Sequence, residues 1–443
     1  MAFTRIVLRS AATGALGGLL FGFDTAVIAG ATHALSDHFS LSTWQLGFTV
    51  SIALWGTVFG ALSAGKIGQR LGSRATLQIM AVLYVLSAVG CALAWSWPVF
   101  LAARLLGGIG IGGSSVLGPV YIAELAPAEY RGRLVGLFQI NIVVGILLAY
   151  FSNFVISALH TGALEWRLDF GMSSIPAVFF LLMLLTIPES PRWLAMRGRS
   201  TEALATLQQL GGSDPAAELN AIARSIHVES TLKQESLFQR RYRKPIVLAA
   251  LIAAFNQLSG INAVLYYLND IFVSAGFSRV SGALQAVVIG LVNLVATLFA
   301  MTLIDRLGRR TLLLIGCAGM VFNLLGICMI FVTGHGRDRL LFLVAAYIAC
   351  FALSSGAVIW VYMSEIFPNE VRVQGQAMGS TVLWVMNGII SQLFPLFAAK
   401  SSSLPFAVFA GVMALQFVLT LIYFPETKGL SLEQLQSKLS LEA

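Results

Sequence analysis

Charged residues are scarce in this chain of 443 residues. Asp, Glu, Lys and Arg together make up 11% of the sequence, whereas a soluble domain carries about 25%. Hydrophobic residues make up 57%, and the mean hydropathy is +0.83. Because a soluble chain this apolar would expose large aggregating patches, the shortage of charge excludes most soluble classes of protein.

Cysteine and histidine are also few and scattered. The four cysteines all lie within apolar runs, where they behave as small hydrophobic residues, so we expect no disulfide framework. The five histidines are predicted to fall outside these runs, and no two have the spacing of metal ligands. We therefore expect no metal site, no Ser-His-Asp arrangement, and a protein that is not an enzyme.

Nucleotide-binding motifs are absent or out of context. The sequence contains no G-x-x-x-x-G-K-[ST], so ATP-driven transport is unsupported, and we expect no nucleotide and no cofactor. Residues 108–113 do match G-x-G-x-x-G, but a dinucleotide site also needs a preceding strand and a following acidic residue. This run lies inside an apolar stretch, where small residues allow helices to pack closely.

Long apolar runs are what the sequence has in abundance. About 20 apolar residues cross the hydrocarbon core as a helix, and these runs are too long and too uniformly apolar for barrel strands. The first run follows Arg5 and Arg9 as in a signal peptide, but its length and Asp24 in its middle indicate a retained helix. We predict an all-α membrane protein with twelve transmembrane helices, at residues 10–32, 45–65, 75–95, 99–123, 133–157, 168–187, 246–268, 281–304, 311–332, 340–363, 373–398 and 404–424.

The positive charge is unevenly distributed between the two sides of this map. Arg104 lies inside a span, five cations lie on one side, and all other Lys and Arg residues lie on the side shared by both termini. This positive-inside pattern predicts cytoplasmic termini in a plasma (inner) membrane. A basic cytoplasmic face accounts for the net charge of +8, so no nucleic acid partner is expected. The five cations on the other side are Arg167, Arg279, Arg337, Arg339 and Lys400.

The sequence indicates a duplicated unit of six helices. Three motifs recur in the same order at an offset of roughly 240 residues, which favours duplication over chance. They are Glu124, Pro127, Glu129 and Arg131 with Glu365, Pro368, Glu370 and Arg372; residues 70–74 with 306–310; and residues 188–190 with 425–427. We predict six-helix bundles at 1–194 and 246–424, a cytoplasmic helical linker at 195–245, and a cytoplasmic tail at 425–443. Two parallel halves suggest a binding site at their interface near the bilayer midplane, with alternating access by rocking.

These repeated loops resemble those of the sugar porter family of the major facilitator superfamily, over essentially the whole chain. The matching segments are residues 188–194, 425–429, 305–310, 257–262 and 266–267. The resemblance extends to bacterial proton-coupled monosaccharide symporters, and it implies the major facilitator fold and sugar transport. Gln69, Val373 and Ala357 stand where the family usually has Asp, Gly and Pro. The first two departures weaken an expected cytoplasmic charge lock, and the third weakens the expected bend of helix 10.

Asp24 and Arg104 are predicted to be the only charged residues well inside spans, in helices 1 and 4. Each alone would cost several kcal/mol in the membrane, so the favourable arrangement is for the two to pair in the protein interior. Pairing stabilises the ionised form of Asp24, whereas burial stabilises its neutral form. A carboxyl balanced between these two effects can change its protonation state as its surroundings change. The alternative is a static ion pair that fixes helix 1 against helix 4. The resemblance favours proton coupling, because proton-linked members have Asp at the position of Asp24.

A sugar site needs amides for the hydroxyl groups and aromatic rings for the C–H face. In helix 7, Gln257 with Gly260 and Asn262 with Tyr266 are spaced to share helix faces. A lone amide in a span can instead simply bond a neighbouring helix, and a tryptophan can be core. The resemblance favours sugar contact for Gln139, Gln257, Asn262, Asn293 and Trp360. The full predicted substrate-binding set is Phe21, Gln139, Asn256, Gln257, Asn262, Tyr266, Asn293, Gly356, Trp360, Trp384 and Asn387.

Two positions bear on which sugar is carried. Asn256 replaces the first Gln of a Gln-Gln pair that is common in the family, and its shorter reach would alter selectivity. Leu383 replaces a polar residue found in some pentose-transporting relatives. The resemblance at Leu383 favours a hexose, with a pentose as the alternative.

Charged residues at the cytoplasmic helix ends are predicted to act as a gate. Opposite charges from the two halves would hold the inner face shut, and the alternative is that they only fix topology. Exposed pairs are each worth about 0–1 kcal/mol, so only a network could bias the equilibrium. By resemblance, Tyr267 closes the outer gate. The predicted gating set is Tyr267, Glu124, Arg131, Glu189, Arg192, Asp305, Arg309, Glu365 and Arg372.

The sequence and its resemblance together predict proton-coupled symport of a monosaccharide into the cell, with sugar, protons and the lipid bilayer as partners. One rival is passive sugar facilitation, in which Asp24 and Arg104 are purely structural. Another is a sugar sensor that binds without turnover, although such sensors tend to carry long signalling tails. A drug exporter fits less well, because the amides of helix 7 suit polyols better than lipophilic cations.

Overall fold

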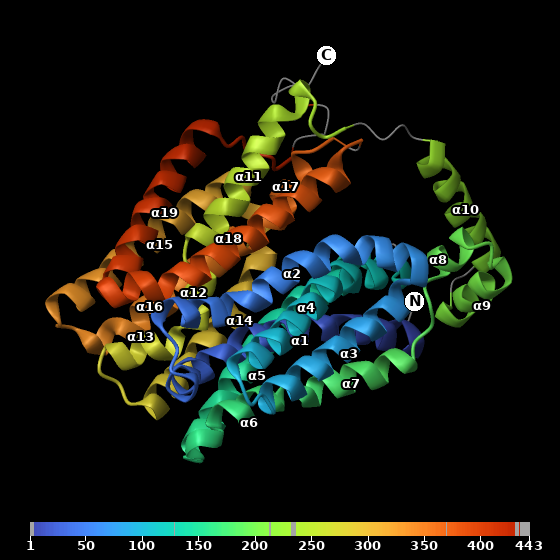
Figure 1. The fold of residues 1–443 in the computed structure, drawn as a ribbon. Helices are drawn as coiled ribbons and strands as arrows, with labels where there is room; N and C mark the ends of the chain where they lie inside the picture. The colour runs from blue at the N-terminus through green and yellow to red at the C-terminus, as the bar shows by residue number, and fades with distance from the viewer. Residues whose placement is uncertain are drawn as a thin grey trace. The chain divides into compact units, whose positions relative to one another are not determined.

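The computed structural model describes residues 4–127, 129–211, 214–231, 236–368, 370–429 and 434, and every secondary-structure element in them is a helix (Figure 1). Twelve helical segments of this described part are long and apolar enough to cross a membrane. Each overlaps one predicted span, so the predicted number of transmembrane helices is confirmed. The predicted tail falls largely on residues 430–433 and 435–443, which lie outside the described residues.

The elements follow one another in a single series along the chain. Up to the end of the predicted linker region they are α1 (Arg5–Phe39), α2 (Thr43–Leu71), α3 (Ser73–Ala92), α4 (Trp97–Leu125), α5 (Arg131–Ala158), η1 (Gly162–Leu164), α6 (Glu165–Met172), α7 (Ser174–Leu185), α8 (Pro191–Met196), α9 (Ser200–Leu210), α10 (Pro215–Thr231) and η2 (Arg240–Tyr242). After η2 they are α11 (Arg243–Leu258), α12 (Ile261–Tyr266), α13 (Leu268–Ser274), α14 (Arg279–Leu307), α15 (Arg309–Thr333), η3 (Arg337–Arg339), α16 (Leu340–Leu353), α17 (Ser355–Glu365), α18 (Arg372–Lys400) and α19 (Leu404–Tyr423).

The chain divides into two compact units. Unit 1 comprises residues 1–28, 52–152 and 160–233, and unit 2 comprises residues 29–51, 153–159 and 234–443. One end of each of α1, α2 and α5 therefore belongs to the second unit. The short helices α8, α9 and α10 form a cluster within unit 1 (Figure 1). The bundle boundaries predicted from the sequence stay predictions.

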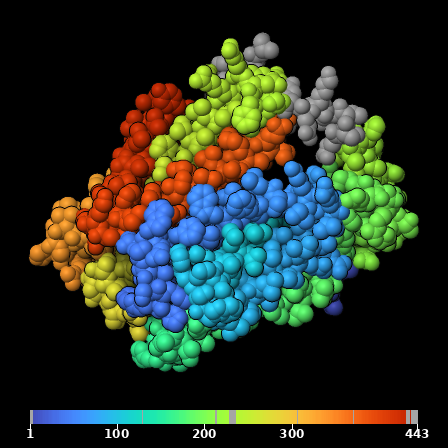
Figure 2. Space-filling view, viewed as in Figure 1, coloured from blue at the N-terminus to red at the C-terminus, as the bar shows by residue number. Residues whose placement is uncertain are grey.

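The glycine run of α4 packs against α2 inside unit 1. A Cβ atom added at Gly108 would overlap the carbonyl oxygen of Ala53, and one added at Gly112 would overlap that of Thr57. Gly60 on α2 meets α4 in the same way. The surfaces of α2 and α4 adjoin in the space-filling view (Figure 2). The G-x-G-x-x-G match therefore serves close helix packing.

Several spans are broken near their middle. The seventh is interrupted at Gly260, which has φ +84° between α11 and α12, and it ends at Tyr266, after which Tyr267 separates α12 from the short helix α13. The tenth is interrupted at Ser354, with φ −122° and ψ −95°, between α16 and α17. Helix 10 is thus broken even though Ala357 replaces the family's usual proline. Broken helices leave backbone groups without intrahelical partners, and transporters use such breaks to line binding sites.

Two predictions about helix geometry are wrong. Gln257 and Gly260 do not share a face of one helix, because α11 ends at Leu258 and the backbone turns left-handed at Gly260. In addition, α1 continues to Phe39, so His33 and His38 lie within this helix and not outside the spans. The Asn262–Tyr266 pair does fall within a single helix, α12.

Replacing Gly260 with alanine is expected to destabilise the protein by roughly 1–3 kcal/mol, because a left-handed backbone penalises a Cβ. The added Cβ would also overlap the ring of Phe409 on α19. The measurement is the melting temperature of the detergent-solubilised protein. Gly411→Ala is the control, because a Cβ there meets nothing within 4 Å. Equal melting temperatures for the two variants would contradict this account of the break.

Candidate functional site

Asp24 of α1 and Arg104 of α4 form an ion pair inside unit 1. The Arg104 Nη1 lies 2.8 Å from Oδ1 and 2.8 Å from Oδ2 of Asp24. Asp24 is 7% exposed and Arg104 is 3% exposed. The pairing predicted from the sequence is therefore present. Because one Arg104 nitrogen contacts both carboxylate oxygens, the pair joins α1 to α4 within unit 1.

The surroundings of this pair are aromatic and closely packed. The Arg104 guanidinium carbon lies 5.4 Å from the centre of the Phe170 ring on α6, and the Phe100 ring packs edge-on against Phe170 at 5.1 Å. The Arg104 Nε is buried without a hydrogen-bond partner. An unsatisfied donor on a buried charge makes the paired state less stable than a fully bonded one. The ion pair therefore lies among aromatic rings with one buried donor left unsatisfied.

Asp169, next to Phe170 in α6, was missed by the sequence reading. It is 1% exposed, and its Oδ1 has no hydrogen-bond partner. The prediction that Asp24 and Arg104 are the only charged residues well inside spans is therefore wrong. The sequence did show an acidic residue near the beginning of the sixth apolar run. Its burial, however, depends on how α6 packs against α3.

Three amides form a chain across the break between α11 and α12 in unit 2. The Asn262 Nδ2 donates to Gln257 Oε1 at 2.8 Å, and the Gln257 Nε2 donates to Asn256 Oδ1 at 2.8 Å. The Asn256 Nδ2 in turn donates to the backbone oxygen of Ser355 at 3.1 Å. Asn256 and Gln257 are both 4% exposed. The chain therefore joins the break in the seventh span to the break in the tenth.

A second set of hydrogen-bonded side chains in unit 2 connects α12 with α18. The Asn387 Nδ2 donates to the Tyr266 hydroxyl at 3.2 Å, and the Ser391 hydroxyl donates to Asn387 Oδ1 at 3.2 Å. The Tyr267 hydroxyl donates to the backbone oxygen of Ser391 at 3.1 Å. The Tyr267 ring stacks on Phe394 with centroids 4.9 Å apart. These contacts attach the end of α12, where the seventh span ends, to α18.

The remaining residues predicted to contact sugar are spread over several helices in both units. In unit 2, Asn293 on α14 is 9% exposed and Trp384 on α18 is 6% exposed, whereas Trp360 on α17 is 44% exposed. Gly356 lies in the first turn of α17, where a Cβ would approach Phe351 at 3.2 Å. Phe21 and Gln139 belong to unit 1, and both are half-buried; Phe21 packs against the core of that unit.

Two glutamates at the ends of the duplicated halves make matching contacts. Glu189 Oε1 accepts a hydrogen bond from the backbone N–H of Arg74 at 3.0 Å, at the start of α3. Glu426 Oε1 accepts one from the backbone N–H of Arg309 at 2.8 Å, at the start of α15. Each carboxylate also occupies the space beside the preceding glycine, Gly72 or Gly308. Both therefore cap the N-terminus of a helix in their own unit, where a negative charge is favourable.

The electrostatics of Glu426 follow from this capping. Partial burial alone would raise its pKa, but hydrogen bonds from the backbone N–H groups of residues 428, 309, 310 and 427 outweigh burial and hold the pKa of Glu426 below its usual range. Glu426 was recognised in the sequence only as part of a motif.

The predicted gating residues are held in contacts within each unit. Arg309 Nη2 lies 2.9 Å from Glu365 Oε1, and Thr427 donates to the other oxygen of Glu365 at 2.6 Å. The Ser73 hydroxyl donates to Glu124 at 3.4 Å. Further contacts are Arg192 with the Ser225 hydroxyl at 3.2 Å and Arg372 with the backbone oxygen of Phe367 at 3.3 Å, while Arg131 is exposed. The side chain of Asp305 lies outside the described part of the structure.

A cluster of titratable groups in unit 2 was also missed. His33 Nδ1 lies 2.9 Å from Asp37 Oδ2 and 2.9 Å from Arg279 Nη2, and Arg279 lies 3.9 Å from Asp37. Next to them, burial raises the pKa of Asp270 to about 6, although a hydrogen bond with Thr32 and the charges of His33 and Arg279 oppose the rise. The only sequence signal was an acid three residues after Tyr267.

The raised pKa of Asp270 predicts a pH-dependent stability. The folded protein keeps this proton up to about pH 6, whereas the unfolded chain loses it near pH 4, so stability falls as the pH rises between these values and levels off above them. Asp270→Asn is expected to remove this part of the slope. The melting temperatures of the wild type and the variant should then converge at low pH, and above pH 6 the melting temperature of the wild type should be lower by a few degrees. The exposed Asp338→Asn is the control, and a slope unchanged in Asp270→Asn would contradict the assignment.

Comparison with known proteins gives one consistent result. Residues 10–439 match the family model described as "Sugar (and other) transporter". The chain is 37% identical to the arabinose-proton symporter of Bacillus subtilis, over 97% of this chain and 94% of that protein. It is 36% identical to the glucose transport protein of Synechocystis, over 97% of each chain. The inward-open structure of the xylose transporter XylE from Escherichia coli superposes with a TM-score of 0.87 at 33% identity, covering 98% of this chain and 99% of that one.

Proposed function

We propose, from the premise that this chain belongs to the sugar transporter family, that it imports a monosaccharide together with protons by alternating access. The family model covers nearly the whole chain, so the protein is a multi-pass membrane transporter of the major facilitator fold and not an enzyme. The named activity of the arabinose-proton symporter, at 37% identity, supports proton coupling.

The observation that carries the proposal is the buried contact of Arg104 with both oxygens of Asp24, at 2.8 Å. Loss of one partner of a buried ion pair leaves an uncompensated charge, which is strongly destabilising. Protonation of Asp24 would release Arg104 and remove the charge that opposes movement of α1 past α4. Asp169 is a second buried carboxyl near the same aromatic residues, and we place it with this pair as a candidate proton-handling group.

The chain of amides formed by Asn256, Gln257 and Asn262 is proposed as the sugar-binding element of unit 2. An amide presents one acceptor and two donors, so these groups can exchange bonds with one another for bonds to sugar hydroxyls. Tyr266 and Asn387 offer a second such pair. Trp360 is open to contact with the apolar face of a ring. Gln139, Phe21, Asn293, Gly356 and Trp384 complete the proposed set by family resemblance.

A pentose is now favoured over a hexose. The preference for a hexose depended on Leu383 alone, whereas two of the relatives described above are named for arabinose and xylose and one for glucose. The relatives therefore reverse this finer prediction, and a hexose stays the alternative substrate.

Orientation and gating complete the proposal. The positive-inside pattern supports cytoplasmic termini, which assigns Glu189, Glu426 and the pair Arg309–Glu365 to the cytoplasmic ends of the helices. Tyr267, bonded to Ser391 and stacked on Phe394, is proposed as the outer gate.

Uptake of labelled arabinose, xylose and glucose into right-side-out membrane vesicles tests this function. With an inwardly directed proton gradient we expect accumulation of at least one pentose above its external concentration, accompanied by proton influx. Equilibration without accumulation, and without proton influx, would favour passive facilitation. Binding of sugar with neither uptake nor exchange would favour a sensor.

A further inference from the structure

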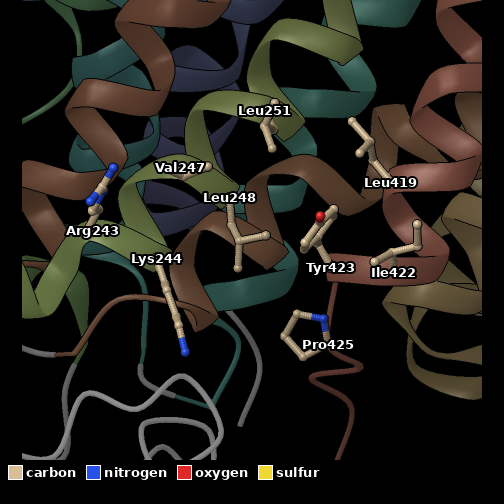
Figure 3. Close-up of a pocket in the computed structure, with 9 residues that line it drawn as sticks. All are labelled: Arg243, Lys244, Val247, Leu248, Leu251, Leu419, Ile422, Tyr423 and Pro425. Carbon is tan, nitrogen blue, oxygen red and sulfur yellow. The ribbon is translucent and has the colours of Figure 1, made fainter.

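A groove with a volume of about 550 Å³ lies between α11 and α19 in unit 2, at the N-terminal end of α11 and the C-terminal end of α19 (Figure 3). Its α11 side includes Arg243, Val247 and Leu251, which are four residues apart and therefore share one helix face, together with Lys244 and Leu248. Its α19 side includes Leu419 and Tyr423, again four residues apart. The volume is within the range of about 300–1,000 Å³ typical of ligand pockets.

The walls of the groove are apolar and accessible. Val247 is 47% exposed, Ile422 is 65% exposed and Tyr423 is 62% exposed. On a membrane-spanning helix, exposed apolar side chains of this kind contact lipid acyl chains. Tyrosine near the end of such a helix sits at the level of the lipid headgroups, because its ring is apolar and its hydroxyl is polar. The groove therefore offers a surface on which a lipid acyl chain can pack. This surface ends at the level of the lipid headgroups.

One end of the groove is positively charged. Arg243 and Lys244, both exposed, are the first two residues of α11 (Figure 3). The Arg243 guanidinium makes no hydrogen bond or ion pair within the part of the chain that the structure describes. The N-terminus of a helix adds partial positive charge at the same place. Glu426, which follows the groove residue Pro425, accepts hydrogen bonds from backbone N–H groups at the start of α15.

We propose that the groove between α11 and α19 binds one anionic phospholipid. Its phosphate and acidic headgroup contact Arg243 and Lys244, Tyr423 lies at the headgroup level, and an acyl chain packs along Val247 and Ile422. Basic pockets between transmembrane helices are where acidic lipid headgroups bind. The site is separate from the proposed sugar and proton sites, and it does not depend on the proposed function.

Native mass spectrometry of the protein released from nanodiscs tests the proposal. The nanodiscs contain phosphatidylcholine with a minor fraction of phosphatidylglycerol, and the readout is the lipid that stays bound. We expect retained phosphatidylglycerol for the wild type. The double variant Arg243→Gln/Lys244→Gln is expected to lose affinity for it by about 30-fold, since each cation near the surface contributes about 1 kcal/mol.

Two comparisons separate the groove from general surface charge. Arg133→Gln/Arg224→Gln removes two exposed cations elsewhere and is expected to keep the bound phosphatidylglycerol. Val247→Trp narrows the groove without changing the charge and is expected to reduce retention. Equal loss in both double variants, no loss in Arg243→Gln/Lys244→Gln, displacement by inorganic phosphate, or equal retention of phosphatidylcholine would each overturn the proposal.

Discussion

Replacement of Asp24 with asparagine is expected to abolish accumulation of sugar against its gradient while preserving exchange of internal for external sugar. Asparagine has nearly the shape of the protonated carboxyl, so the variant imitates the proton-loaded carrier permanently. The ion pair with Arg104, at 2.8 Å, can no longer form. In proteoliposomes, the ratio of internal to external sugar should fall to about one under a proton gradient, because proton and sugar fluxes are no longer linked.

The control for this variant lies on the same helix. Asp37 of α1 is an exposed carboxylate, with 67% of its side chain accessible, and Asp37→Asn is expected to accumulate sugar. If Asp24→Asn also accumulates sugar, the coupling role of this carboxyl is wrong. If the variant loses exchange and uptake together, the pair is a static link between α1 and α4. In that case Asp24→Asn/Arg104→Gln should recover stability, since removal of one buried partner alone costs about 3–5 kcal/mol.

Replacement of Gln257 with alanine is expected to raise the KM for sugar exchange by about 10- to 100-fold. Gln257 is the middle member of the amide chain, so its loss removes the bonds to sugar proposed for it and leaves Asn256 and Asn262 without their partner. This range corresponds to about 1.4–2.8 kcal/mol, which lies within the cost of about 1–3 kcal/mol for an unsatisfied buried polar group. Exchange kinetics with labelled pentose provide the measurement.

A buried amide outside the chain provides the comparison for Gln257. Asn323 of α15 is 7% exposed and donates to the carbonyl oxygen of Gly319 in its own helix, at 2.7 Å. Asn323→Ala is therefore expected to leave the KM unchanged. A KM for Gln257→Ala that matches the wild type would show that the amide chain only joins helices, as in the alternative interpretation of lone amides in spans.

The sequence alone was sufficient for the twelve spans. Hydropathy over about 20 residues is a local property, and the requirement to pair every backbone group in the membrane leaves a helix as the only outcome. The Asp24–Arg104 pair was also predictable, because two isolated charges in apolar runs each need a partner. The repeated Pro-Glu motifs pointed correctly to equivalent positions, and the structure adds that Glu189 and Glu426 cap corresponding helices.

Only the tertiary structure decided the breaks in the helices and the order of the amides. The left-handed backbone at Gly260 is selected by the approach of Phe409, which lies about 150 residues later in the chain. The link from Asn262 through Gln257 and Asn256 to Ser355 depends on two broken helices meeting, and no spacing within one helix encodes that meeting. Asp169 and Asp270 were missed for the same reason. Burial of a single carboxyl is set by packing between helices, whereas the apolar pattern of a span is set by its own residues.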